Sequence, residues 1–238
     1  MKRREIVAIV QSQDFPGNVK KWSAHDSKGW TIAHEAAKHG KLPAGFDQWD
    51  LTAEYGWTVA HEAARRGSLP AGFNRWYISD SFGWSVAHEA ARRRNLPEGF
   101  SDLRRPDYFC WTVAHEVASY KTLPKEFDGW DAAENFHGWT VAHVAARWGT
   151  IPEGFDRWSI ANKRGRSVAH VAARFGHLPA GFDQWEIKDR SGWTVAHEAA
   201  RWGSLPECFD MWDLKDGGGM TVAQVAEQCG HLPKGVMV

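Results

Sequence analysis

The chain has 238 residues, and its 29 Lys and Arg are balanced by 29 Asp and Glu, so its formal charge is zero when histidine is neutral. This balance excludes a global electrostatic attraction to nucleic acid or to anionic membranes. The three cysteines are an odd number without close spacing, which argues against a disulfide framework or a zinc site and favours a reducing compartment.

The N-terminus is basic, but the apolar run that follows it, residues 6–10, is too short for the core of a signal peptide. No other stretch approaches the length of a membrane span. We therefore expect a soluble, cytoplasmic protein without a membrane partner.

A tetrad Thr/Ser-x-Ala-His recurs with steps of 27, 27, 27, 28, 27, 27 and 27 residues, the last copy carrying Gln in place of His. Gly-Trp or a variant precedes each tetrad, and a Leu-Pro or Ile-Pro pair, a Phe and a Trp follow it. Of the 15 tryptophans, six occupy the first Trp position and seven the second, whereas Trp148 and Trp202 lie in neither. A fixed period of this length is typical of stacked repeats.

In chain order, residues 1–22 align with the later units after a shift of one period, so we expect a degenerate N-terminal cap. Each repeat within residues 23–216 then begins at a Thr or Ser N-cap, continues as a two-turn helix such as Val59–Arg66, and ends at a Gly such as Gly67. The Pro and Gly that follow predict one tight helical turn with Leu69, Phe73 and Trp76 packed inward.

Residues 217–238 are expected to form a C-terminal cap, because Met220, Gln224 and Val236 replace the recurrent Trp, His and Phe. End units of a stack have one neighbour and are therefore altered. The sequence thus predicts an all-α solenoid of about eight full short helix-turn-helix repeats plus the N-terminal cap, in a single repeat domain spanning residues 1–238.

One segment, residues 94–121, breaks the pattern. Arg94 and Lys121 replace the terminating Gly, Leu103 replaces Trp, Cys110 replaces Gly, and the single step of 28 residues occurs here. We interpret the segment as either a hinge or a site of contact with a partner.

The pattern Gly-x-Thr-x-x-His-x-Ala-Ala-x-x-Gly resembles the first half of an ankyrin repeat over nearly the whole chain, although the period is 27 residues against about 33 in ankyrins. It looks like the compact ankyrin-like arrays of bacterial and phage proteins. The resemblance implies that each His is hydrogen-bonded near the capping Thr and to the next loop. It also implies that the two residues between Ala-Ala and Gly lie on the surface that contacts partners.

Those two positions vary from repeat to repeat, as does the position after His, where Glu gives way to Val in two repeats. Together they predict an apolar surface rimmed by arginine, the usual make-up of a protein interface. Its residues are Tyr120, Val144, Arg147, Trp148, Val171, Arg174, Phe175, Arg201 and Trp202, with Arg66 and Arg93 in earlier repeats. The alternative is that closer packing of these helices buries the aromatic side chains.

The leading hypothesis is a non-catalytic scaffold or inhibitor that binds another protein. The second is nucleic-acid binding through the Arg-rich earlier repeats, at Arg65, Arg66, Arg92, Arg93, Arg94, Arg104 and Arg105, some of which follow a Glu at ion-pair spacing. We expect no enzyme activity, cofactor, metal or small-molecule substrate, because the chain contains no phosphate loop, nucleophile motif or metal-ligand spacing. Histidines one layer apart, about 8–10 Å, are too far from each other to share an ion.

Overall fold

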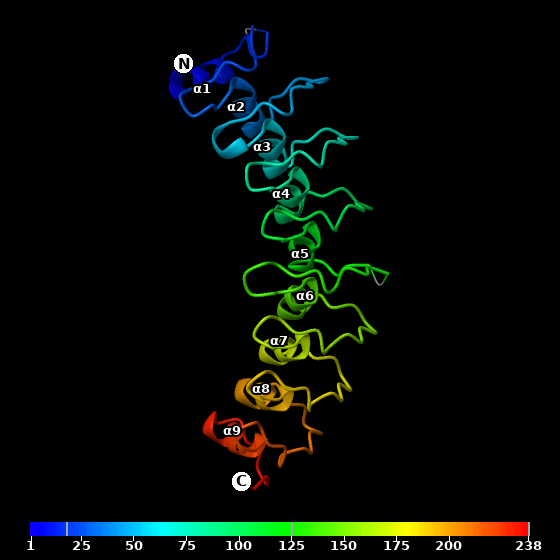
Figure 1. The fold of residues 1–238 in the computed structure, drawn as a ribbon. Coiled ribbons are helices and arrows are strands. Elements are labelled where there is room, and N and C mark those ends of the chain that lie inside the picture. Colours follow the sequence, from blue (N-terminus) through cyan, green and yellow to red (C-terminus); the bar gives the residue numbers. More distant parts are fainter. Residues whose placement is uncertain (18, 125, 238) are drawn as a thin grey trace. The chain divides into compact units, whose positions relative to one another are not determined.

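The computed structural model describes residues 1–17, 19–124 and 126–237, and over these residues it is all-helical, with isolated β-bridges but no strand. The chain forms two compact units, Met1–Tyr108 and Phe109–Val238. Within each unit, consecutive helices pack against each other in chain order, as expected of a helical repeat protein (Figure 1).

The first unit contains α1 (Arg3–Gln11), α2 (Ile32–Lys38), the 3₁₀ turn η1 (Glu54–Gly56), α3 (Val59–Arg66) and α4 (Val86–Arg92). The second contains α5 (Val113–Ala118), α6 (Val141–Trp148), α7 (Val168–Phe175), α8 (Val195–Trp202) and α9 (Val222–Gln228). The N-terminal cap supplies α1, and each copy of the tetrad supplies one helix.

Each short helix is held at both ends. At the N-terminus of α3 the Thr58 hydroxyl accepts the His61 amide, and at the C-terminus Gly67 adopts φ 68°, a left-handed conformation that glycine reaches without steric cost. The alanines of α3, like those of most repeat helices, are fully buried. Their small side chains allow neighbouring helices to approach closely, which helices of seven or eight residues need because they are unstable alone.

A buried histidine links each helix to the next repeat. In α2, Nδ1 of His34 accepts the Thr31 amide at 3.3 Å and lies 2.7 Å from the Thr31 hydroxyl, while Nε2 donates to the Trp57 carbonyl at 3.1 Å. Because a backbone amide can only donate, the imidazole is neutral with its proton on Nε2. The same link to the following repeat recurs at His61, His115, His143, His170 and His197. The expected structural role of the histidines is confirmed.

The second half of each repeat is not helical, so the predicted helix-turn-helix unit is wrong in this part. After α3, the Phe73 amide donates to the Pro70 carbonyl at 3.1 Å, and Gly72 has φ 77°. A positive φ at the third residue makes a tight turn that cannot continue as an α-helix. The inward packing is confirmed, because Leu69, Phe73 and Trp76 lie against the buried core.

The recurrent Phe and Trp of this second half form a ladder of edge-to-face rings. In the second unit Phe155, Trp158 and Phe182 follow one another with ring centroids 5.2 and 5.5 Å apart and interplanar angles of 86° and 81°. In the first unit the ladder runs from Phe15 to Phe100. Edge-to-face contacts add about 0.5–1.5 kcal/mol per pair beyond burial, so these tryptophans serve the stack.

The loops before the helices also bond from one repeat to the next. The Glu54 amide donates to the Lys28 carbonyl at 2.9 Å, and the Ser81 amide donates to the Tyr55 carbonyl at 2.9 Å. Inside a loop an aspartate closes the turn: Asp80 accepts the amides of Phe82 and Trp84. Backbone groups that lack helical partners are thereby satisfied.

The boundary between the two units falls inside the irregular segment 94–121. Arg94 and Cys110, which replace glycines there, keep the left-handed conformation with φ of 61° and 60°. This conformation costs a residue with a Cβ more than it costs glycine. That residues 1–238 fold as one domain stays a prediction.

Burial lowers the pKa of His34 from 6.5 to about 4 and lowers the pKa of four further histidines of the row, His61, His143, His170 and His197. We therefore expect the free energy of unfolding to be at its full value above pH about 6.5 and to fall as the pH drops toward about 4. In that range the histidines are protonated in the unfolded chain but not in the folded chain. Each histidine can therefore lower the free energy of unfolding by up to about 1.4 kcal/mol per pH unit. Urea unfolding at about pH 7.5 and about pH 5 measures the difference.

The control for this prediction is His143→Gln, chosen because the last repeat carries Gln224 at this position, where its Oε1 accepts the Thr221 amide at 2.9 Å. This variant removes one titrating group and keeps the bond to the capping residue, so its loss of stability on acidification should be smaller. A chain as stable at pH 5 as at pH 7.5 would contradict the assigned neutral state.

Two tryptophan variants separate the ladder from the surface. Trp158 is 5% exposed and Trp148 is 56% exposed. Trp158→Ala should lower the free energy of unfolding by about 3–5 kcal/mol, because it leaves a large cavity. Trp148→Ala should cost less than about 1 kcal/mol. If both variants lowered the urea midpoint equally, the ladder of rings would not be a main source of the stability of the repeats.

Candidate functional site

The aromatic side chains that sequence analysis placed on a binding surface are exposed. Trp148, Phe175 and Trp202 stand at the C-terminal ends of α6, α7 and α8 with exposed fractions of 56%, 41% and 46%. The alternative that closer helix packing buries them is therefore wrong. Tyr120, in the repeat of α5, is half-buried.

Arginines alternate with these rings. The Arg147 guanidinium lies 5.7 Å from the Trp148 ring centroid and 5.6 Å from that of Phe175. Arg174 lies 5.7 Å from Phe175 and 4.9 Å from Trp202, and Arg201 lies 5.9 Å from Trp202. We call these six residues the aromatic–arginine row. Each cation–π contact contributes about 0.5–1 kcal/mol at an exposed site, so the contacts favour this arrangement of rings and guanidinium groups.

The two valines expected in the same surface lie below it. Val144 and Val171 each have 4% of their surface exposed. The position after His faces the stack, since Glu35, Glu62 and Glu198 at the same position are also 1–3% exposed. The prediction that these valines are exposed is therefore wrong. Val144 and Val171 are buried beneath the exposed aromatic rings.

Arg66 and Arg93, in the first unit, are engaged within their own helices. Nε of Arg66 donates to Glu62 at 3.2 Å, and Nε of Arg93 donates to Glu89 at 3.0 Å. Arg105, part of the nucleic-acid hypothesis, pairs with Asp102 at 2.7 Å. Part of the positive charge of the early repeats is thus balanced locally.

A recurrent Trp–Glu pair, which sequence analysis did not anticipate, joins the loop before a helix to the first turn of that helix. The indole Nε1 at the first Trp position donates to the glutamate five residues further along the chain, which directly follows the histidine. The distances are 2.9–3.4 Å. The pairs are Trp30–Glu35, Trp57–Glu62, Trp84–Glu89, Trp111–Glu116 and Trp193–Glu198. We call the place occupied by these carboxyl groups the carboxylate position. Its signal in the sequence is that Trp and Glu occur together in these repeats.

Two of these carboxylates also receive a guanidinium from the preceding repeat. Arg3, on α1, pairs with Glu35 at 2.8 Å and lies 4.2 Å over the Trp30 ring, and Arg166 pairs with Glu198. Burial raises the pKa of Glu35, but the hydrogen bond from His39 and the charge of Arg3 outweigh it and hold the pKa below its usual value. Glu35 is therefore a buried anion that depends on its cations.

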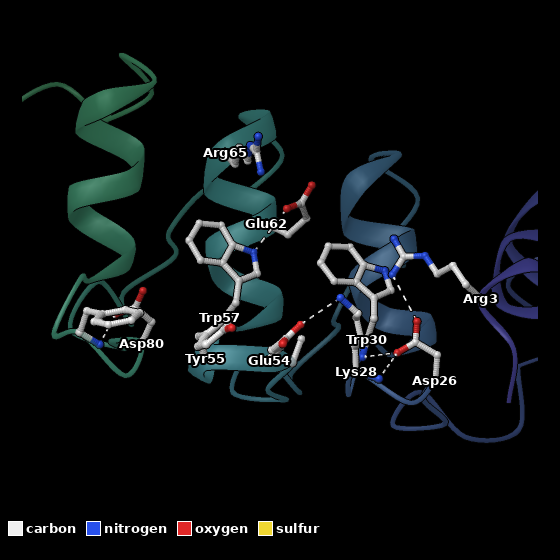
Figure 2. A pocket seen from close by; sticks show the side chains of 12 residues that line it. Arg3, Asp26, Lys28, Trp30, Glu54, Tyr55, Trp57, Glu62, Arg65 and Asp80 are labelled. Atoms are coloured by element: carbon white, nitrogen blue, oxygen red, sulfur yellow. Dashed lines mark hydrogen bonds and ion pairs between the residues drawn. The ribbon is translucent and has the colours of Figure 1, made fainter.

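A cavity of about 450 Å³ in the first unit lies beside these groups (Figure 2). Figure 2 shows the Trp30 and Trp57 indoles beside the adjacent helices α2 and α3, with Glu62 bonded to Trp57 and Lys28 directed toward Glu54. Acidic and basic side chains alternate around it, so its wall carries little net charge. We call it the tryptophan cavity.

A second cavity, of about 240 Å³, lies in the second unit between α6 and α7 and is lined by many of the same repeat positions. Here Arg164 stands where the first unit has Phe82, and His137 stands where it has Tyr55. Its wall contains no acidic side chain among the residues that the structure describes. The wall consists of His137, Trp139, Arg147, Asn162, Arg164, Arg166, Val171, Arg174 and Phe175. We call it the arginine cavity.

Other kinds of site were sought over the same residues. No group of three or more His, Cys, Asp or Glu side chains is arranged to hold a metal ion in the described part of the chain. Among the helices of that part, none has the length and apolar character that crossing a membrane requires. No protein-family model matches the chain, and no curated protein matches its sequence.

The contact of Arg3 with Glu35 predicts a role for the N-terminal cap in stability. Arg3→Ala leaves the Glu35 carboxylate, 1% exposed, with fewer compensating charges and should cost about 1–2 kcal/mol. Amide hydrogen exchange of α1, which is held by the buried Ile6 and Val10, should become faster. Arg4→Ala, at an exposed residue of the same helix, is the control and should leave exchange unchanged.

Proposed function

We propose that the chain is a non-catalytic scaffold that binds another protein through the aromatic–arginine row, on repeats of ankyrin-like type. The observation that carries the proposal is the exposure of Trp148, Phe175 and Trp202 on three consecutive helices, each ring flanked by guanidinium groups. Large aromatic side chains and arginines supply most of the binding energy in protein interfaces. The same repeat position carries His39, Arg66 and Arg93 in the first unit, so the stack does not require a ring there.

The ankyrin-like type is supported by the cap-to-histidine bond and by its continuation to the next repeat, which the family resemblance implies. The half-buried Tyr120 stands at the equivalent position on the preceding helix and extends the row toward α5. A reducing cytoplasm agrees with three exposed, free cysteines, Cys110, Cys208 and Cys229. A scaffold of this kind inhibits its partner if the bound surface includes the partner's own working site.

Nucleic acid is the weaker candidate. Phe175 and Trp202 each have two guanidinium groups within 6 Å of the ring centroid, so the faces on which bases would stack are already in contact with arginine. In the first unit Arg66 and Arg93 are paired with glutamates of their own helices. Binding to phosphates would show a steep dependence on salt, and a gel shift at low salt measures it.

The test of the scaffold is the double variant Trp148→Ser and Trp202→Ser. Capture of the partner from the source cells, followed by mass spectrometry, should fall by about tenfold or more, because the variant removes two exposed anchors. Thermal unfolding should change little, since both side chains lie outside the core.

The matched control is Tyr77→Ser, which removes an exposed ring (59%) that lies outside the aromatic–arginine row. Capture by this variant should equal that of the wild type. If the double variant captures the same partner as efficiently as the control, the row is not the binding surface.

A further inference from the structure

The arginine cavity lacks a group that the repeat supplies elsewhere. Five repeats place a glutamate at the carboxylate position, where it accepts the indole N–H of its own repeat. In α6 and α7 that position is Val144 and Val171. A valine can neither accept a hydrogen bond nor neutralise a charge.

The donors that would meet such a carboxylate are still present. Trp139 lines the cavity, and within the described residues its Nε1 has no acceptor, unlike the indoles that are paired with Glu. Arg147 occupies the same place on α6 as Lys38 does on α2, where Nζ reaches the Glu35 carboxylate at 3.4 Å. One indole donor and the guanidinium of Arg147 therefore line a cavity in whose wall Val171 stands at the carboxylate position.

The charge of the cavity agrees with this replacement of Glu by Val. Arg166 is engaged with Glu198, but over the described part of the chain no carboxylate lies within ion-pair distance of Arg147, Arg164 or Arg174. Three guanidinium groups without anionic partners around one cavity repel one another, and a bound anion would relieve this repulsion. Arginine presents paired N–H groups that match a planar carboxylate.

We propose that the arginine cavity binds the carboxylate of an aspartate or glutamate side chain of the partner protein, an inference that rests on the proposed function. The carboxylate lies in the cavity beside Val171, accepts the Trp139 indole N–H, and pairs with Arg147 and Arg174. Because Arg147, Arg174 and Phe175 belong both to the cavity and to the aromatic–arginine row, the acidic residue of the partner stands beside the segment that covers the rings. The partner segment is therefore acidic and apolar together.

The geometry favours a side-chain carboxylate over a nucleic-acid phosphate. Among the repeats that carry the histidine, the glutamate is missing in α6 and α7 and returns on α8 as Glu198. A phosphate backbone requires cations along its track and avoids carboxylates. A volume of about 240 Å³ also suits one or two side chains rather than a nucleotide.

The decisive variant supplies the missing carboxylate from the chain itself. Val144→Glu restores the residue found in other repeats, so an internal carboxylate should engage the Trp139 indole and Arg147 and make them unavailable to a ligand. Fluorescein-labelled hexaglutamate is the probe, with hexaglutamine as the uncharged control, and anisotropy is recorded at low salt with the full chain. We expect hexaglutamate to bind the wild type, hexaglutamine not to bind, and Val144→Glu to weaken hexaglutamate binding by about tenfold or more.

Three variants separate charge from shape and from folding. Val144→Gln has the size of Glu without its charge and should weaken binding less than Val144→Glu does. Arg147→Gln changes an exposed side chain and should weaken binding by about tenfold even if Val144→Glu does not fold. Arg65→Gln is its matched control, since Arg65 holds the equivalent place on α3, where Glu62 is present, and it should bind like the wild type.

The proposal is wrong if hexaglutamate fails to bind the wild type, or if Val144→Glu and Arg147→Gln both bind it unchanged. It is also wrong if labelled single-stranded dT12 binds more tightly than hexaglutamate and is lost in the same variants, because the ligand is then a phosphate. These outcomes leave the scaffold proposal open to its own test, since partner capture through Trp148 and Trp202 is measured separately.

Discussion

The stack depends on one interaction, the bond from a buried neutral histidine to the next repeat. His143 receives the Thr140 amide on Nδ1 and donates from Nε2 to the Arg166 carbonyl at 2.9 Å, so one side chain closes its own helix and holds the following loop. Helices of six to nine residues are too short to be stable alone. The stability of each helix therefore depends on contacts with the neighbouring repeats, and the histidine hydrogen bond is one of these contacts.

This bond also explains why the rest of the repeat is so constant. The helices must approach closely for the imidazole to reach the next carbonyl, which favours small side chains, chiefly alanine, at the buried helix positions. On the other side of the repeat the edge-to-face ladder of Phe and Trp fills the wider space between turns. The buried helix residues and the ring ladder make the same contacts in every repeat. Substitutions that would suit a partner would therefore disrupt the packing between repeats.

Residues can vary at positions that do not pack between repeats, and the walls of the two cavities differ at such positions. Equivalent places on the repeat carry indoles and balanced charges in the first unit and, among the described residues, guanidinium groups without acidic neighbours in the wall of the second. Replacement of Glu by Val at 144 and 171 changes little in the core, since both side chains are buried, but it removes the anions that compensate nearby arginines. A single buried position thus alters the charge of the surface above it.

The sequence by itself determined the period and the helix positions, which follow from capping residues and helix-terminating glycines. The histidine bonds were implied by the resemblance to ankyrin repeats. Exposure of Trp148, Phe175 and Trp202 was predicted with burial as the alternative, and the structure decided between the two. The helical turn after Leu-Pro was predicted wrongly, because the positive φ of Gly72 depends on the packing of Phe73 and Trp76 against the core. Only the tertiary structure decided that Val144 and Val171 point into the stack, that Arg3 covers Trp30, and that the Trp139 indole lacks an acceptor in the described part of the chain. Each of these depends on which side chains from neighbouring repeats share one space, and sequence spacing alone does not specify it.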